Sequence, residues 1–270
     1  MSLATITETV LRRDRAVVLV GLSTIVVLSW TYLIYLAGDM SSMKAMNMGD
    51  AGMAMEMAMP AIQPWEALDY WLMFVMWAVM MLAMMTPSAA PMVLTYTKIS
   101  GRQGDDLKPV MGTAVFFFGY LLIWTVFSAA ATLAQGGLHA ATLLSPMMET
   151  TSPILGGIIL IAAGVFQFTP LKQACLSHCR TPLGYFMTEW REGKWGALIM
   201  GVRHGAFCVG CCWLLMALLF VAGVMNLFWI AVLAAYVLFE KVLPHGHRIS
   251  WAFGGLMIAW GVWLIAGVLL

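Results

Sequence analysis

The five cysteines of this 270-residue chain fall into two short clusters, and histidine accompanies each cluster. Thiolate and imidazole bind Cu(I) and Zn(II), whereas oxygen ligands suit Mg²⁺ and Ca²⁺. The two clusters therefore predict a site for a soft transition metal, with copper as the first expectation and zinc as the alternative. The candidate ligands are Cys175, His178 and Cys179 in the first cluster and His204, Cys208, Cys211 and Cys212 in the second.

Helical spacing limits which of these side chains can share one ion. If the first cluster is helical, Cys175 and Cys179 lie one turn apart on the same face. His204 and Cys208 are about 6 Å apart along a helix axis and can chelate together, but about 10.5 Å separates His204 from Cys211. A single site therefore has to combine the two segments. The most economical combination is Cys175, Cys179, His204 and Cys208, with Cys211 and Cys212 further along the helix.

Two other kinds of function compete with metal binding. Cys208 and Cys211 have the C-x-x-C spacing of thiol oxidoreductases, although a reducing cytoplasm disfavours a permanent disulfide. His204 is a candidate ligand for haem or partner for a quinone, but the chain lacks both the C-x-x-C-H haem attachment and a nucleotide-binding glycine loop. A membrane oxidoreductase, by thiol relay or with haem or quinone, is therefore one alternative. A packing or assembly subunit of a larger membrane complex is the other, and no feature assigns a catalytic reaction.

Methionine is abundant, with 24 copies, and eight of them are concentrated in one short segment. Thioether sulfur is a soft ligand that suits Cu(I) and needs no deprotonation. A flexible apolar segment lying on a membrane surface is the alternative, but the segment contains no other large apolar residue. It therefore predicts capture of a soft metal. The methionines are Met40, Met43, Met46, Met48, Met53, Met55, Met57 and Met59.

A second group of methionines is spaced like one face of a helix. Met73, Met76, Met80 and Met84 follow at intervals of three, four and four, and Met81 and Met85 lie one position around. Such a stripe is typical of core packing, and with the other soft ligands it also indicates a metal relay through Met76, Met80 and Met84. Pro87 and Pro91 are expected to break or kink this helix.

These residues are positioned by a membrane-embedded helical bundle. The chain is 62% hydrophobic and 10% charged, with a mean hydropathy of +0.88, and its net charge of +1 excludes a basic nucleic-acid binder. The predicted fold class is all-α, a polytopic transmembrane bundle of about seven spans. The expected spans are 16–37, 68–96, 110–134, 154–170, 196–224, 227–243 and 249–270.

Basic residues predict the orientation of this bundle. With the N-terminus inside, Lys44 is the one exception among fourteen Lys plus Arg to the positive-inside rule, and the C-terminus lies outside. The first span has the length of an uncleaved signal anchor. The chain is thus expected to be a multi-pass protein of the bacterial inner membrane. Its parts are a cytoplasmic terminus (1–15), the anchor (16–37), an extracytoplasmic Met-rich loop (38–67) and a six-helix domain (68–270).

Two kinds of residue inside the spans bear on packing and support. Arg203 and Glu240 are ionisable and costly in a bilayer, so they are candidates for functional support, either in contact with each other or near the headgroups. Glycines at helical spacing, such as Gly201 and Gly205, predict close approach of helices.

The motifs together resemble the prokaryotic family of uncharacterised, predicted metal-binding integral membrane proteins. The resemblance rests on W-x-x-M-x-x-A-M-M-x-P from Trp77, K-x-x-C-L-x-x-C-R-x-P from Lys172, and G-x-x-x-G-x-x-C-x-G-C-C-W-x-L-M from Gly201, followed by G-x-M-N and E-K. It covers roughly 68–241 and implies metal binding without a known reaction. The expected partners are the bilayer and a periplasmic metal donor or acceptor, or a larger membrane complex, and no nucleic acid.

Overall fold

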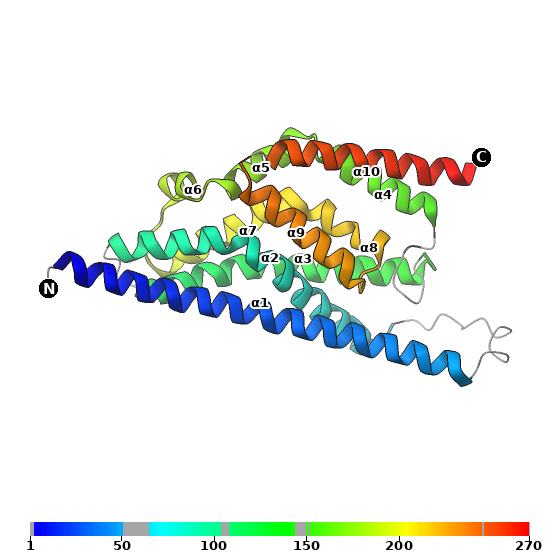
Figure 1. The fold of residues 1–270 in the computed structure, drawn as a ribbon, viewed down its shortest axis with the longest axis horizontal. Coiled ribbons are helices and arrows are strands. Elements are labelled where there is room, and N and C mark those ends of the chain that lie inside the picture. Colours follow the sequence, from blue (N-terminus) through cyan, green and yellow to red (C-terminus); the bar gives the residue numbers. More distant parts are fainter. Residues whose placement is uncertain are drawn as a thin grey trace.

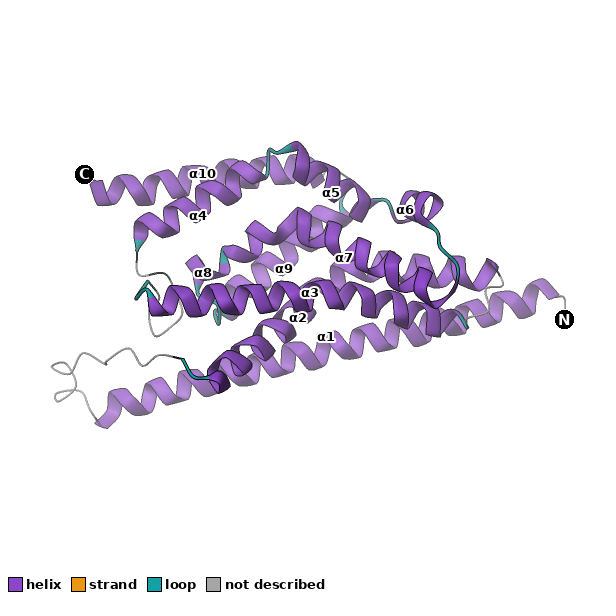
Figure 2. Ribbon diagram, turned by 180° about the vertical axis from the view of Figure 1, so that it is seen from behind, coloured by secondary structure: helices purple, strands orange, loops and turns teal. Residues whose placement is uncertain are grey.

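The computed structural model describes residues 3–50, 65–103, 108–143, 150, 152–244 and 246–269, and in these it contains ten helices and no strand. The all-α expectation is confirmed (Figure 2). The helices are α1 (Leu3–Asp50), α2 (Ala67–Gln103), α3 (Pro109–Ala140), α4 (Pro153–Phe166), α5 (Pro170–Arg180), α6 (Pro182–Glu189), α7 (Gly193–Ala217), α8 (Leu219–Ala222), α9 (Leu227–Val242) and α10 (Gly246–Leu269).

Each expected span contains a helix, although 154–170 and 196–224 are interrupted. Fewer helices than seven meet the requirements for crossing a bilayer alone. Five do so by length and hydropathy, and α4 with α5 makes a sixth if the bent pair counts as one span. The remaining segment, α9, has only 16 residues. The result indicates a multi-pass membrane protein. The start of α1 and the end of α10 lie at opposite ends of the bundle (Figure 1), and the side on which each lies stays a prediction.

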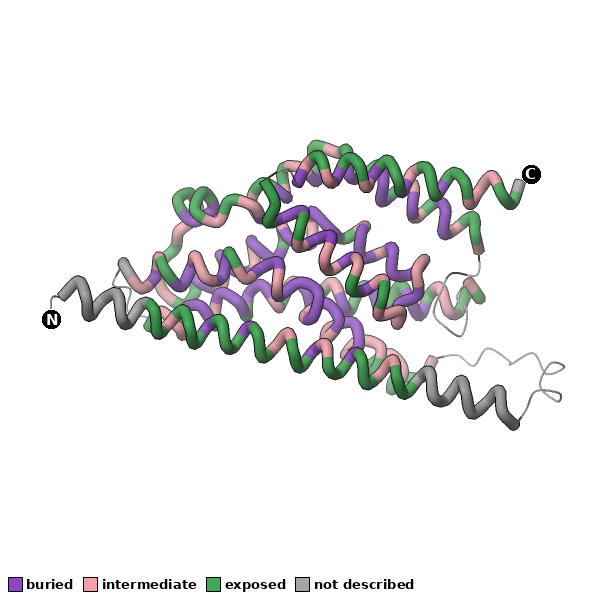
Figure 3. Tube along the Cα trace, viewed as in Figure 1, coloured by how far each residue is buried: buried purple, intermediate pink, exposed green. Residues whose placement is uncertain are grey.

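The buried residues concentrate on the inner helices. In Figure 3 the buried residues gather on α2, α3 and α7, whereas few residues are buried on α10 and on the described side chains of α1. The exposed side chains are themselves apolar, including Val20 on α1 and Trp263 on α10. Such surfaces suit contact with lipid. The polar candidate ligands lie inside the bundle instead.

Two pairs of helices approach closely through glycine, as the small residues in the spans predicted. On α7, a Cβ built at Gly201 would lie 1.9 Å from the carbonyl oxygen of Phe116 on α3. On α4, a Cβ at Gly164 would lie 2.7 Å from the carbonyl oxygen of Gly254 on α10. Any side chain at these positions has to push the helices apart, so the two contacts fix how α7 and α10 sit.

The Met-rich segment is only partly a loop. The α1 helix continues to Asp50, well beyond the predicted anchor, and its backbone includes Met40, Met43, Met46 and Met48. The side chains of these four methionines lie outside the described part of the chain, as do Met53, Met55, Met57 and Met59 altogether. Capture of metal by this segment stays a prediction.

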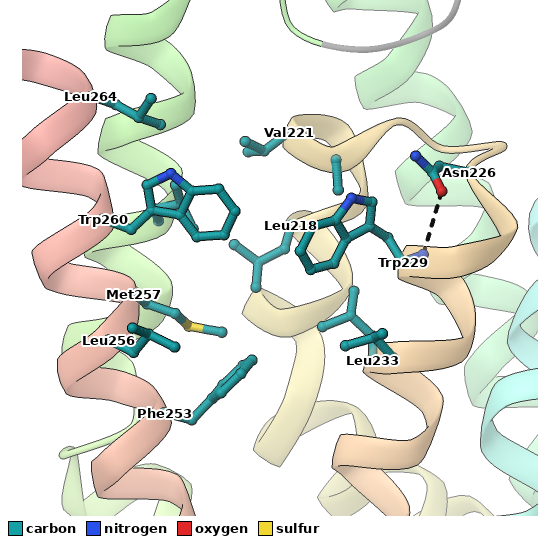
Figure 4. A pocket seen from close by; sticks show the side chains of 13 residues that line it. Leu218, Val221, Asn226, Trp229, Leu233, Phe253, Leu256, Met257, Trp260 and Leu264 are labelled. Carbon is teal, nitrogen blue, oxygen red and sulfur yellow. Dashed lines mark hydrogen bonds between the residues drawn. The ribbon is translucent and has the colours of Figure 1, made fainter. Parts of the chain in front are cut away.

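A cavity of about 440 Å³ lies between α4, α8, α9 and α10 (Figure 4), and no cysteine is among its lining residues. Its lining is apolar except for Asn226, whose side-chain oxygen accepts the Trp229 backbone N–H at 3.5 Å and so caps α9. The lining suits an apolar chain. Met257 is the one soft metal ligand among the lining residues.

Candidate metal centre

Four of the five cysteines meet in the interior of the bundle. Cys208, Cys211 and Cys212 share one face of α7, since they are spaced by three and four residues, and all three are fully buried. Cys179 of α5 is buried opposite them, and its side chain interacts with those of Cys208 and Cys211. The thiols thus come from two separate helices, as a shared site requires.

A bend between α4 and α5 brings Cys179 to this place. The two helices meet at 64°, and α5 starts anew with Thr169 as its cap, because the Thr169 hydroxyl accepts the Lys172 N–H at 3.3 Å and Pro170 occupies the first turn. The α5 helix then lies against α7, where a Cβ at Gly210 would be 2.9 Å from the sulfur of Cys175. Cys175 is therefore half-buried over Gly210, beside the thiol group.

The sulfur of Cys208 accepts hydrogen bonds, whereas the neighbouring thiols donate them. The Lys241 ammonium on α9 donates to Cys208 Sγ at 2.9 Å and to the Ser88 hydroxyl at 3.2 Å. Cys211 and Cys212 donate their S–H groups to the Cys208 carbonyl oxygen at 3.1 and 2.9 Å. Cys208 is therefore the sulfur whose surroundings favour a negative charge.

His204 lies one turn before Cys208 with its imidazole nitrogens unused. The residue is 2% exposed, and its ring stacks on Tyr120 at 5.4 Å between centroids. Neither Nδ1 nor Nε2 has a hydrogen-bond partner among the described residues. Buried polar atoms without partners are rare, so this imidazole is available to a ligand that enters the site.

Tyr185 of α6 closes the site on the side of His204, with the two rings 6.0 Å apart. Burial, with a smaller contribution from the nearby Glu189 carboxylate, raises the pKa of the Tyr185 phenol. The hydroxyl therefore keeps its proton and donates a hydrogen bond to the Met200 carbonyl oxygen at 2.7 Å. Tyr185 therefore forms part of the wall of the site and is not a candidate metal ligand.

His178 is turned away from the thiols. Its Nδ1 lies 2.8 Å from the Ala174 carbonyl oxygen, and its ring stacks on Phe207 at 4.2 Å. All five cysteines are free, so Cys208 and Cys211 form no disulfide. Within the described ranges, no three His, Cys, Asp or Glu side chains form a group that could hold a metal ion as they stand. The combination Cys175, Cys179, His204 and Cys208 is thus not assembled as one ligand set.

The methionine stripe of α2 is buried and runs towards the thiols. Met76, Met80 and Met84 are at most 2% exposed, and Met81 and Met85 are equally buried on the adjoining face. The Tyr120 hydroxyl lies 3.4 Å from the Met85 carbonyl oxygen and 3.3 Å from Cys208 Sγ. The α2 backbone beside the stripe and the thiol group are therefore joined through one side chain of α3.

Gln135 of α3 holds the other end of the stripe. Its Oε1 accepts the indole N–H of Trp77 at 2.6 Å, and its Nε2 donates to the sulfur of Met73 at 3.8 Å. Met73 is only half-buried, so the stripe passes from a partly exposed methionine to fully buried ones.

The expected contact between Arg203 and Glu240 is wrong. Arg203, which is 42% exposed, pairs with Glu189 of α6 instead. Glu240 is fully buried and pairs with Lys172 at 2.7 Å, and its depth in the membrane stays a prediction. The basic partner of Glu240 comes from α5, and the sequence analysis did not pair these two residues.

Sequence analysis missed three polar residues at the site, namely Ser88, Tyr120 and Lys241. The signal for Lys241 was present, because it follows Glu240 in an apolar segment, and two adjacent charges cannot face the same partner on one helix. No signal distinguished Tyr120 or Ser88 from other polar residues in the spans.

Comparison with known proteins connects this geometry with a metal. PpoB2, described as a copper chaperone, matches residues 74–264. The chain belongs to this copper-chaperone family. The matched region includes the buried methionines from Met76, all five cysteines and Lys241, and it leaves out the Met-rich segment that ends α1. No curated protein and no solved structure shows significant similarity to the chain.

Proposed function

We propose that this protein holds Cu(I) at the thiols of α5 and α7 and passes it on within the membrane. The observation that carries the proposal is the meeting of Cys179 with Cys208 in the interior, beside a His204 imidazole whose nitrogens are unused. Two thiolates suffice to bind Cu(I), because this ion is soft and tolerates low coordination. Cys179 and Cys208 are the proposed pair, with His204 as a third ligand.

The route to this pair is proposed to follow the methionines. Thioethers at the end of α1 and beyond capture Cu(I) outside, and Met76, Met80 and Met84 conduct it along α2. Thiolates bind Cu(I) more tightly than thioethers do, so the final step, from thioether to Cys208, is favourable. The Tyr120 hydroxyl, which contacts the Met85 carbonyl oxygen and Cys208 Sγ, supports the proposal that this part of α2 lies close to the thiols. A periplasmic donor or acceptor of copper is the partner that this route implies.

Metal analysis of cysteine variants tests the proposal. The full chain, purified without chelator and loaded anaerobically with Cu(I), should show a thiolate-to-copper charge-transfer absorbance in the ultraviolet, which thioethers do not give. The double variant C179S/C208S should lose this absorbance. The matched control is Cys175→Ser, because Cys175 lies half-buried over Gly210 and outside the proposed pair. If the double variant keeps the absorbance, or if Cys175→Ser alone abolishes it, the proposed pair is wrong.

A further inference from the structure

Lys241 is a buried cation that pairs with no carboxylate among the described residues. Its ammonium donates hydrogen bonds to Ser88 and Cys208, and the residue is 6% exposed. The other buried lysine, Lys172, is paired with Glu240. A charge taken out of water has to be balanced by an opposite charge nearby, so the counter-charge of Lys241 is carried by the sulfur cluster.

The remaining charges of the bundle interior are already balanced. Lys172 and Glu240 form a pair with no net charge, and Glu189 of α6 neutralises Arg203 at the edge. His204 is uncharged when it acts as a metal ligand. Arg180, next to Cys179, donates instead to the carbonyl oxygens of Leu243 and Pro244. Among the described residues, Lys241 is therefore the cation that hydrogen-bonds a thiol sulfur and that the sulfur cluster has to balance.

This single charge distinguishes a monovalent from a divalent ion. Metal-bound cysteines are thiolates, and Cys179 with Cys208 is the pair that can ligate without taking Cys211 and Cys212 from the Cys208 carbonyl oxygen. Two thiolates on Cu(I) leave one negative charge, which the ammonium cancels. Two thiolates on a divalent ion leave none, so the ammonium and a neutral complex remain together as a net positive charge in a medium of low dielectric constant.

We infer that Lys241 is the specificity-determining residue of the thiol site and selects monovalent soft cations over divalent ones. It acts by its charge and its position, without becoming a ligand. The inference rests on the proposed function, because it presumes that the ion binds between Cys179 and Cys208.

The test compares the affinities of Cu(I) and Co(II) in the same preparations. Both ions give thiolate charge-transfer bands, so the absorbance reports binding at the cysteines alone, in full-length protein in lipid nanodiscs under anaerobic conditions. Lys241→Met removes the charge at similar volume and should lower the ratio of Cu(I) to Co(II) affinity by about tenfold or more, as expected for a charge next to the ion. Lys241→Arg keeps the charge and should leave the ratio within about threefold of the wild type.

A matched control separates the charge of Lys241 from general damage to the core. The double variant K172M/E240Q removes another buried lysine without changing the net charge, and it should leave the ratio unchanged. A misfolded variant weakens both ions together, whereas loss of the counter-charge changes their ratio. If Lys241→Met aggregates, Lys241→Gln is measured in its place. The wild type alone also tests the inference, because equal affinities for Cu(I) and Co(II) in the wild type would overturn it.

Failure of the inference and failure of the proposed function give different results. An unchanged ratio in a copper-binding Lys241→Met or Lys241→Gln variant overturns the role of Lys241 and leaves the copper site in place. A wild-type protein that shows no charge-transfer band with either ion overturns the thiol site, and the selectivity assigned to Lys241 with it.

Discussion

The ammonium of Lys241 donates a hydrogen bond to the sulfur of Cys208 at 2.9 Å, across the contact between α9 and α7. The preceding residue, Glu240, faces the other way and pairs with Lys172 of α5. Consecutive charges on α9 thus hold it to two different helices. This explains how a helix of 16 residues keeps a fixed place in the interior of the bundle.

The buried ion pair makes a prediction about stability. Lys172→Met leaves the Glu240 carboxylate buried without its cation and should destabilise the fold by about 3–5 kcal/mol. The double variant K172M/E240Q should recover most of this loss, because neither charge is then left alone. Unfolding by denaturing detergent, followed by circular dichroism, measures both. A Lys172→Met protein as stable as the wild type would contradict a buried pair at this position.

Close packing of α3 on α7 makes a second prediction. Gly201→Ala places a methyl group against the Phe116 carbonyl oxygen, which is backbone and cannot turn aside, so the helices have to separate at a cost of about 1–3 kcal/mol. Gly255→Ala on α10 is the matched control, because a Cβ there meets nothing within 4 Å. Thermal unfolding in detergent should show a lower midpoint for Gly201→Ala only. Equal midpoints would mean that α3 and α7 are not in close contact.

The helices were predictable from sequence because runs of apolar residues have one physical solution in a bilayer. Each expected span contains a helix, and the methionine stripe on α2 is buried from Met76 onwards, as its spacing indicated. The bend before α5 was not expected, although Thr169 followed by Pro170 is a pattern typical of a helix start. Since that bend decides which face of α5 meets α7, the sequence analysis did not separate Cys179, which joins the thiols, from Cys175, which lies beside them.

The polar contacts of the site were harder to predict than the thiols. Cys208, Cys211 and Cys212 share a face by spacing alone, so their meeting follows from the helix itself. The partner of Cys208, in contrast, comes from α9, and pairing between helices depends on how they are arranged. Arg203 and Glu240 illustrate this, because each found a nearer partner on α6 or α5.

Topology is a third prediction and depends on charge counting alone. Reporter domains fused after Asp50, inserted at Glu192 and fused at Leu269 should report outside, inside and outside, since basic residues gather on the side of Glu192. Glu192 is exposed between α6 and α7, so an insertion there is tolerated more readily than one within a helix. An external reporter at Glu192 would reverse the membrane orientation and place the Met-rich segment inside, which would exclude capture of copper from outside.

The last prediction concerns His204, whose ring packs against aromatic neighbours while its nitrogens form no hydrogen bond with the described residues. His204→Phe should keep the stacking on Phe116 and Tyr120, and neither lost nitrogen has a hydrogen-bond partner among the described residues, so thermal stability should change little. The affinity for Cu(I) should fall by about tenfold or more, since even groups that only orient metal ligands contribute that much. His178→Phe is the matched control: its ring stacks on Phe207 away from the thiols, and Cu(I) affinity should stay unchanged. A chelator competition titration measures both variants, and equal Cu(I) affinities in His204→Phe and the wild type would remove His204 from the ligand set while leaving Cys179 and Cys208 in it.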